Sequence, residues 1–203
     1  MKNLTMFLIT TYPSLIYAII FIVSFLFWLI FEIWLFSRDR GTVKKNSLDR
    51  GSRSWVIIAL VIGIVLGFNM PSIAPMFNVQ NHSAIFFTLG ITLIWVGILF
   101  RYWAIRTLGK FFRTRLVIQE HHELITNGLY KYLRHPSYTG AIITLIGFGF
   151  GVGNWLSIAV LITIGLPAYI WRIRVEERML FRQFGKAYED YKKRTWHLIP
   201  FIW

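Results

Sequence analysis

Long apolar runs, separated by clusters of basic residues, are the feature that most limits how this chain can fold. A helix that crosses a bilayer needs about 20 mostly apolar residues, and its backbone polar groups must bond within the helix because no water is present to satisfy them. The chain has 203 residues, of which 56% are hydrophobic and 15% are charged. Its mean hydropathy is +0.55. The sequence therefore predicts an all-α, polytopic membrane protein with about five transmembrane helices.

Three of these helices are expected in the first half of the chain, at about residues 14–36, 55–68 and 83–108. The second is expected to continue to Ala74 through Pro71. Glu32 is the single ionisable residue of the first span, and Arg101 lies in the last turns of the third. An arginine so placed either extends its side chain to the interface or faces a site.

The second half begins with two shorter apolar runs, residues 137–152 and 154–171, which predict a helical hairpin. Each arm is near or below the usual spanning length. Glycines between the runs supply the backbone freedom of a tight turn, and the alternating glycines at positions 147, 149, 151 and 153 favour close helix packing. A charged tail with helical spacing begins at Arg172, and Gly185 is the expected stop or bend.

The distribution of charge predicts one topology. Basic residues gather in loop 37–54, after the third span and in the tail, whereas the connection 71–82 contains no Lys, Arg, Asp or Glu. Because cytoplasmic loops carry excess Lys and Arg, we expect the N-terminus outside and the C-terminus in the cytoplasm. The chain is expected to form a single integral membrane domain over 1–203. Residues 1–108 supply three N-terminal helices, and 109–203 supply a cytoplasmic catalytic loop, the hairpin and the tail.

Composition also argues against several classes of function. The net charge of +13 lies between apolar segments, which fits membrane topology and anionic lipid headgroups better than nucleic acid, so no nucleic-acid partner is expected. The absence of cysteine excludes thiolate nucleophiles and cysteine-ligated metals. No metal site is expected, because the adjacent His121 and His122 point in different directions and no third ligand has a recognised spacing.

Polar residues concentrate in 119–138 and again from Arg172. Ionisable groups beside the hydrocarbon are costly unless they are paired or used, so this region is the predicted site, with interfacial anchoring as the alternative. His135-Pro136 predicts the start of the fourth helix, since proline is favoured in a first helical turn. The free N–H groups of that turn favour an anionic ligand group such as a carboxylate.

Five ordered motifs carry a family resemblance over roughly the C-terminal half, from Gln119 onward. They are H-x-L-I-T-x-G-x-Y, RHPSYTG, EE-x-x-L, FG-x-x-Y-x-x-Y-K-K-R and the closing IPFI. Together they resemble the isoprenylcysteine carboxyl methyltransferase family, with its related bacterial and archaeal members. The first three helices match that family only in being apolar.

The resemblance implies methyl transfer from S-adenosylmethionine, with S-adenosylhomocysteine as product, to a lipid-like or prenylated acceptor, in a setting of membrane lipids. Arg172 falls where the family engages its acceptor, and Arg134 is a second cationic candidate near the reacting centre. The planar guanidinium of arginine suits a carboxylate or phosphate group. By motif position, the residues expected to bind the donor are Gln119, His122, Glu123, Leu124, Ile125, Tyr130, His135, Pro136, Ser137, Tyr138 and Glu176.

Several alternatives stand beside this interpretation. A phospholipid amine methyltransferase would share the membrane setting and the donor, but Arg172 would matter less. A sterol-type reductase using a nicotinamide cofactor resembles the same half, although this chain looks short for it, and a membrane scaffold or transporter without activity is the third. Among single residues, Glu177 is expected to pair with Arg174 or Arg178, while Tyr188 and Tyr191 are expected to pack the tail against the body.

Overall fold

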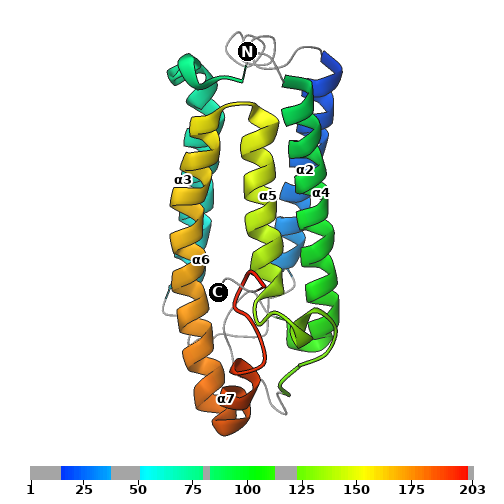
Figure 1. Ribbon diagram of the computed structural model, residues 1–203, viewed down its shortest axis with the longest axis vertical. Helices are drawn as coiled ribbons and strands as arrows, with labels where there is room; N and C mark the ends of the chain where they lie inside the picture. The colour runs from blue at the N-terminus through cyan, green and yellow to red at the C-terminus, as the bar shows by residue number, and fades with distance from the viewer. Residues whose placement is uncertain (1–14, 38–50, 80–82, 113–122, 201–203) are drawn as a thin grey trace.

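The computed structural model describes residues 15–37, 51–79, 83–112 and 123–200. Five long helices lie side by side along the molecule (Figure 1). In chain order they are α2 (Leu15–Ser37), α3 (Ser52–Ile73), α4 (Ser83–Leu108), α5 (Pro136–Val152) and α6 (Trp155–Phe184), followed by the short α7 (Lys186–Lys192). Three 3-10 turns complete the described elements: η1 (Pro75–Phe77), η2 (Gly109–Phe111) and η3 (Gly128–Lys131).

Four segments are long and apolar enough to cross a membrane: α2, α3, residues Ala84–Phe111 and α6. Large apolar side chains cover their outer faces, including Ile30, which is 66% exposed, and Ile85, which is 65% exposed. A surface of this kind is stable against lipid chains and not against water. The predicted all-α, multi-pass membrane architecture is confirmed. The fifth helix, α5, has 17 residues and is shorter than a usual span.

Two predicted boundaries are settled by the structure. The second span does continue through Pro71, which lies buried inside α3. The second arm of the hairpin is not short, because α6 runs without interruption for 30 residues and carries Arg172 and the start of the predicted tail. Its end at Phe184, followed by Gly185 with a φ of 52°, is the stop that the sequence predicted. Hydropathy underestimates the length of this arm because the apolar run ends at Arg172, whereas a helix ends where its hydrogen bonding is broken.

Glycines bring α4 and α5 into close contact. A Cβ placed on Gly147 would lie 2.6 Å from the backbone nitrogen of Ile94, and one on Gly97 would lie 2.6 Å from the carbonyl oxygen of Gly140. A Cβ on Gly149 would lie 2.7 Å from Ile158 Cα on α6, and one on Gly151 would lie 2.7 Å from the Phe21 ring on α2, so the predicted close packing is confirmed for positions 147, 149 and 151. Gly153 instead ends α5 with a φ of 72°.

Replacing Gly97 by alanine is therefore expected to destabilise the protein. The added methyl group would overlap backbone atoms that cannot rotate away, and overpacking of this kind costs about 1–3 kcal/mol. Gly63→Ala is a matched control, since a Cβ there would find its nearest neighbour 3.6 Å away on Ile164. Thermal unfolding in detergent should show a lower midpoint for Gly97→Ala only, and equal midpoints for the two variants would contradict close contact of α4 with α5.

The C-terminal segment returns to the lower end of α5 (Figure 1). The backbone N–H of Trp196 donates to the Tyr132 carbonyl, and the N–H groups of Arg134 and His135 donate to carbonyls of residues 196 and 197. The two tyrosines of α7 are buried, and the Tyr191 hydroxyl donates to the Tyr130 carbonyl over 2.7 Å. The predicted packing of Tyr188 and Tyr191 against the body is confirmed, and it holds residues 193–198 beside the α5 N-terminus.

Candidate functional site

The site is built where α5 begins against the lower half of α6. Pro136 is the first residue of α5, as predicted, and His135 precedes it with a non-helical φ of −126°. Because proline lacks a backbone N–H, this position loses no helical hydrogen bond. The arrangement buries His135 and Ser137 at the helix start and directs Tyr138 toward α6.

A chain of hydrogen bonds joins Tyr138 to two residues of α6. The Tyr138 hydroxyl donates to Glu176 Oε2 over 2.7 Å, and Arg172 Nε donates to the Tyr138 oxygen over 2.9 Å. Arg172 and Glu176 are four residues apart and share one helix face. A further Arg172 nitrogen donates to Ser52 Oγ at the start of α3, over 3.1 Å. These bonds fix the guanidinium, which is only 5% exposed.

His135 lies between the two acidic side chains of α6. Its Nδ1 is 3.7 Å from Glu176 Oε2, and its Nε2 is 3.4 Å from Glu177 Oε1. The imidazole stacks on the Tyr138 ring with 5.7 Å between ring centres. The side chain of Glu176 remains 24% exposed, so this carboxylate can still meet a bound cation.

Arg134 belongs to a separate network that holds the tail. Its Nε donates to Glu177 over 2.9 Å, and its terminal nitrogens donate to Thr195, to the Lys192 carbonyl and to His197 Nδ1. The expected pairing of Glu177 with Arg174 or Arg178 is wrong. Neighbours in sequence point outward along α6, where Arg174 and Arg178 are exposed, while tertiary packing brings Arg134 to the carboxylate from another element.

Burial lowers the pKa of His197 below its ordinary value, against the opposing pull of the Glu177 carboxylate. The surrounding bonds fit a neutral ring. An Arg134 N–H donates to Nδ1 over 2.7 Å, and Nε2 lies 3.3 Å from Glu177 Oε1, at a distance for donation. A proton added at Nδ1 would remove the acceptor that Arg134 uses.

Acidification is therefore expected to weaken the attachment of the tail through His197. An unfolded histidine takes up its proton at about pH 6.5, whereas the folded protein keeps this ring neutral to lower pH, so its stabilisation is present above about pH 6.5 and is lost below it. Arg134, Glu177 and His135 are the charged or titratable groups that face it. The midpoint temperature of thermal unfolding should decrease as the pH is lowered from about 7.5 to about 5.5. His197→Asn should make this decrease smaller. An unchanged pH dependence in that variant would assign the effect to another group.

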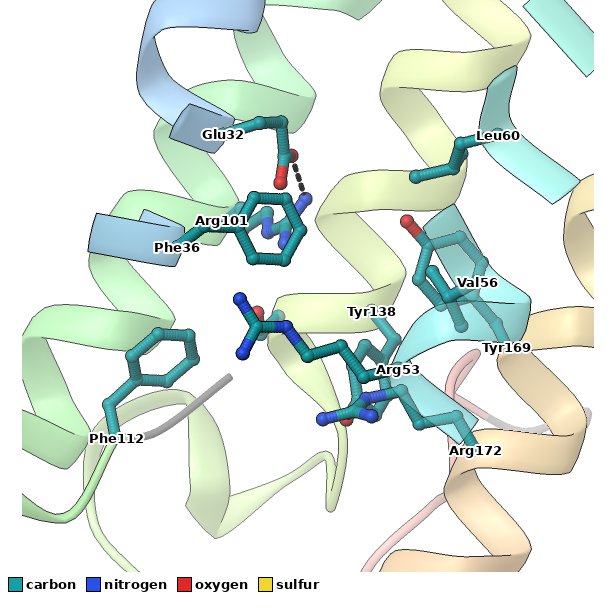
Figure 2. A pocket seen from close by; sticks show the side chains of 11 residues that line it. Glu32, Phe36, Arg53, Val56, Leu60, Arg101, Phe112, Tyr138, Tyr169 and Arg172 are labelled. Atoms are coloured by element: carbon teal, nitrogen blue, oxygen red, sulfur yellow. Dashed lines mark hydrogen bonds and ion pairs between the residues drawn. The ribbon is translucent and has the colours of Figure 1, made fainter. Parts of the chain in front are cut away.

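A small cavity lies between Arg172 and the Glu32–Arg101 pair (Figure 2). Its volume of about 50 Å³ is enough for a few water molecules or one carboxylate group. The walls come from all five long helices, and their polar residues are Glu32, Arg53, Arg101, Ser137, Tyr138, Tyr169 and Arg172. Arg101 faces this site and donates to Glu32, so the alternative of an arginine extending to the interface is not what the structure shows.

Sequence reasoning missed the contributions of the first two described helices to this cavity. Arg53 lines it from the start of α3, and Phe36 and Glu32 line it from α2, none of which belongs to a motif. Ser52, beside Arg53, accepts a hydrogen bond from Arg172. The sequence did contain one signal for the contribution of α2, which is Glu32, the single acidic residue of the first span. An isolated ionisable residue in a membrane helix indicates a partner or a site.

The predicted donor-binding residues divide into three groups. His135, Pro136, Ser137, Tyr138 and Glu176 come together at the junction of α5 and α6. Tyr130 is buried nearby in η3, while Glu123 is exposed and Leu124 and Ile125 are half-buried in the segment before it. Gln119 and His122 lie outside the described residues.

Comparison with known proteins gives a consistent set of relatives. The family model described as isoprenylcysteine carboxyl methyltransferase matches residues 88–182. Protein-S-isoprenylcysteine O-methyltransferase B of Arabidopsis thaliana is 35% identical over 115 residues, which cover 56% of this chain and 58% of that protein. The corresponding enzyme of Dictyostelium discoideum is 41% identical over 107 residues, covering 49% of this chain and 43% of that protein.

A solved structure is also similar. The eukaryotic intramembrane Ras methyltransferase, an isoprenylcysteine carboxyl methyltransferase, aligns with a TM-score of 0.56 and 32% identity over 72% of this chain and 52% of that one. The chain thus spans about three fifths or less of the length of these relatives. They are eukaryotic, and the expected likeness to bacterial and archaeal members gains no support from them. The matched region contains the cavity arginines of α4 and α6 and the start of α5, and over this region the chain is similar to the isoprenylcysteine carboxyl methyltransferase family.

Proposed function

We propose that this protein transfers a methyl group from S-adenosylmethionine to the carboxylate of a lipid-like or prenylated acceptor at the cytoplasmic face of the membrane. The observation that carries the proposal is the pair of hydrogen bonds that link Arg172 to the Tyr138 hydroxyl and that hydroxyl to Glu176. It couples a buried cation that lines an intramembrane cavity to a partly exposed carboxylate outside it. The predicted orientation, with the C-terminus in the cytoplasm, is part of the proposal.

The donor would lie at the junction of α5 and α6. Glu176 has the exposure and charge to offset a cationic ligand, and His135 Nδ1 lies 3.7 Å from its carboxylate. When bound, S-adenosylmethionine supplies an electrophilic methyl carbon: the acceptor oxygen bonds to it, the carbon–sulfur bond breaks, and its electron pair stays on sulfur as a neutral thioether. Gln119, His122, Glu123, Leu124, Ile125, Tyr130, Pro136 and Ser137 complete the proposed donor site.

The acceptor carboxylate would be held by Arg172. Its planar guanidinium suits a carboxylate, and the bonds to Tyr138 and Ser52 fix its orientation before the acceptor arrives. No proton needs to move, because the ionised acceptor is already a nucleophile. The residues therefore contribute by positioning both groups and by excluding water.

Arg134 has a different part in this arrangement. We expected it near the reacting centre, but its donors are engaged by Glu177, His197 and the tail backbone. We propose that Arg134 acts as a positioning residue, which keeps the tail against the start of α5.

An apolar groove supports approach of the acceptor from the lipid phase. It lies between α3 and α6 and is lined by Trp55, Ala59, Ile164, Ala168 and Trp171. Two of its residues, Trp55 and Trp171, immediately precede the cavity residues Val56 and Arg172 in the sequence. An acyl or prenyl chain in this groove would remain in an apolar medium while its polar end reached the cavity.

The alternatives are less well supported. An amine acceptor would meet the arginines of the cavity as like charges, and the relatives are named as O-methyltransferases. A reductase would bind a nicotinamide cofactor, and a scaffold would transfer no methyl group.

Two measurements test the proposed function. S-adenosylhomocysteine, but not NADPH, is expected to raise the thermal midpoint of the purified protein, because a ligand that binds only the folded state stabilises it. Labelled donor should pass its methyl group to an S-farnesylated cysteine derivative with a free carboxylate. A folded protein that ignored S-adenosylhomocysteine, or responded to NADPH instead, would overturn the assignment.

A further inference from the structure

Glu32 and Arg101 form an ion pair inside the membrane-spanning bundle. Glu32 lies on α2 and Arg101 on α4, and an Arg101 terminal nitrogen donates to the Glu32 carboxylate. Their side chains are 7% and 11% exposed. Ionisable residues at such positions are costly, and they usually pair with one another and mark a pathway or a site.

The pair leaves part of the arginine unsatisfied. Arg101 Nε is buried and has no hydrogen-bond partner among the described residues. A buried donor without an acceptor is destabilising, and a purely structural pair would gain from satisfying it. Arg101 also lines the same cavity as Arg172 (Figure 2).

The charge around the cavity points to an anionic ligand. The described lining residues include three guanidinium groups, Arg53, Arg101 and Arg172, and a single carboxylate, Glu32. Charges in an apolar surrounding are screened weakly, so guanidinium groups that line one cavity favour an anion that enters. A carboxylate fits because it has acceptor sites for more than one arginine.

We propose that Arg101 is a second acceptor-binding residue, which contacts the acceptor carboxylate together with Arg172, and that Glu32 is the positioning residue that holds Arg101 in the bundle. The inference rests on the proposed function and names the part of the chain that selects an ionised acid. Methylation converts the acceptor into a neutral ester, so the product loses its charge-assisted bonds to both arginines. The cavity thereby distinguishes acceptor from product by charge.

Arg101→Met tests the proposal, because methionine keeps most of the side-chain volume without the charge. We expect wild-type protein to bind the S-farnesylated cysteine carboxylate more than about 100-fold more tightly than its methyl ester, since each charge-assisted hydrogen bond contributes a factor of about 10 to 100. Arg101→Met should lower this preference by about the factor of one such bond and raise KM by a similar factor. Arg106→Gln is the matched control, since Arg106 is exposed on the same helix, and it should keep both values.

A second variant separates binding from folding. Arg101→Met alone leaves Glu32 without its partner, whereas Glu32→Gln with Arg101→Met removes both charges, and neutral replacement of a buried pair is often well tolerated. The double variant should unfold near the wild-type midpoint and show the same reduced preference for the carboxylate as Arg101→Met. A double variant that regained wild-type preference and KM would show that the pair is structural and would overturn the proposal.

Binding of S-adenosylhomocysteine distinguishes this failure from failure of the proposed function. The proposed donor site lies at the junction of α5 and α6. S-adenosylhomocysteine should therefore raise the unfolding midpoint of Arg101→Met, of Arg106→Gln and of the double variant as much as that of the wild-type protein. Retained stabilisation with an unaltered acid-to-ester preference would refute the role of Arg101 alone. Loss of stabilisation in the wild-type protein would refute the proposed function itself.

Discussion

Replacing Arg172 by lysine is expected to lower kcat/KM by about 100-fold or more. Lysine keeps the charge but cannot make the bonds of Nε to Tyr138 and of the terminal nitrogen to Ser52 that orient the guanidinium. The loss should come from misplacement of the acceptor carboxylate and not from weaker donor binding. Methyl transfer at varied acceptor concentration, together with the shift of the thermal midpoint by S-adenosylhomocysteine, would measure both.

Arg174→Lys is the matched control for this change, since Arg174 is exposed on the same helix two residues later. It should retain wild-type activity. In contrast, His135→Ala and Glu176→Ala are expected to weaken donor binding, because these side chains lie on the proposed donor side. Equal donor affinity in Arg172→Lys, His135→Ala and Glu176→Ala would contradict this division of the site.

Glu177→Gln is expected to destabilise the fold by about 3–5 kcal/mol, the usual cost of breaking a buried ion pair by removing one partner. The side chains of Glu177 and Arg134 are 15% and 4% exposed, so the arginine charge would remain buried without its carboxylate. His135 and His197 would meet an uncharged amide in place of the carboxylate. Thermal unfolding in detergent measures the effect, and limited proteolysis should show earlier cleavage within the tail.

Glu189→Gln makes the same chemical change at an exposed position of α7. Its midpoint should match that of the wild-type protein. If Glu177→Gln unfolded at the same temperature as Glu189→Gln, the network around Arg134 would have no structural role, and Arg134 would again be a candidate for contact with the acceptor.

Much of the fold was predictable because lipid restricts the choices of a chain. Runs such as residues 83–108 must become helices if they cross a bilayer, and α4 has those bounds. The start of α5 was predictable for a local reason, since proline after His135 favours the first turn of a helix. The extent of α6 was not, since hydropathy changes at Arg172 while helical hydrogen bonding continues to Phe184.

The two arginines of the predicted site show where sequence reasoning ends. Arg134 and Arg172 have the same chemistry, and both belong to or adjoin a motif. The structure directs Arg172 into a cavity and surrounds Arg134 with tail carbonyls and Glu177. Spacing cannot separate these roles, because the partners of Arg134 are contributed by residues about 40 to 60 positions away.

Hydropathy, the placement of charge and a few local stop and start signals were enough to specify a helical membrane protein and to locate its polar region, since each depends on short-range chemistry. Pairing Glu32 with Arg101, closing the cavity with α2 and α3, and assigning separate tasks to neighbouring cations required the packed bundle. The physical reason is that the role of a buried charged side chain depends on the groups that surround it. In this molecule those groups come from helices that are distant in the chain.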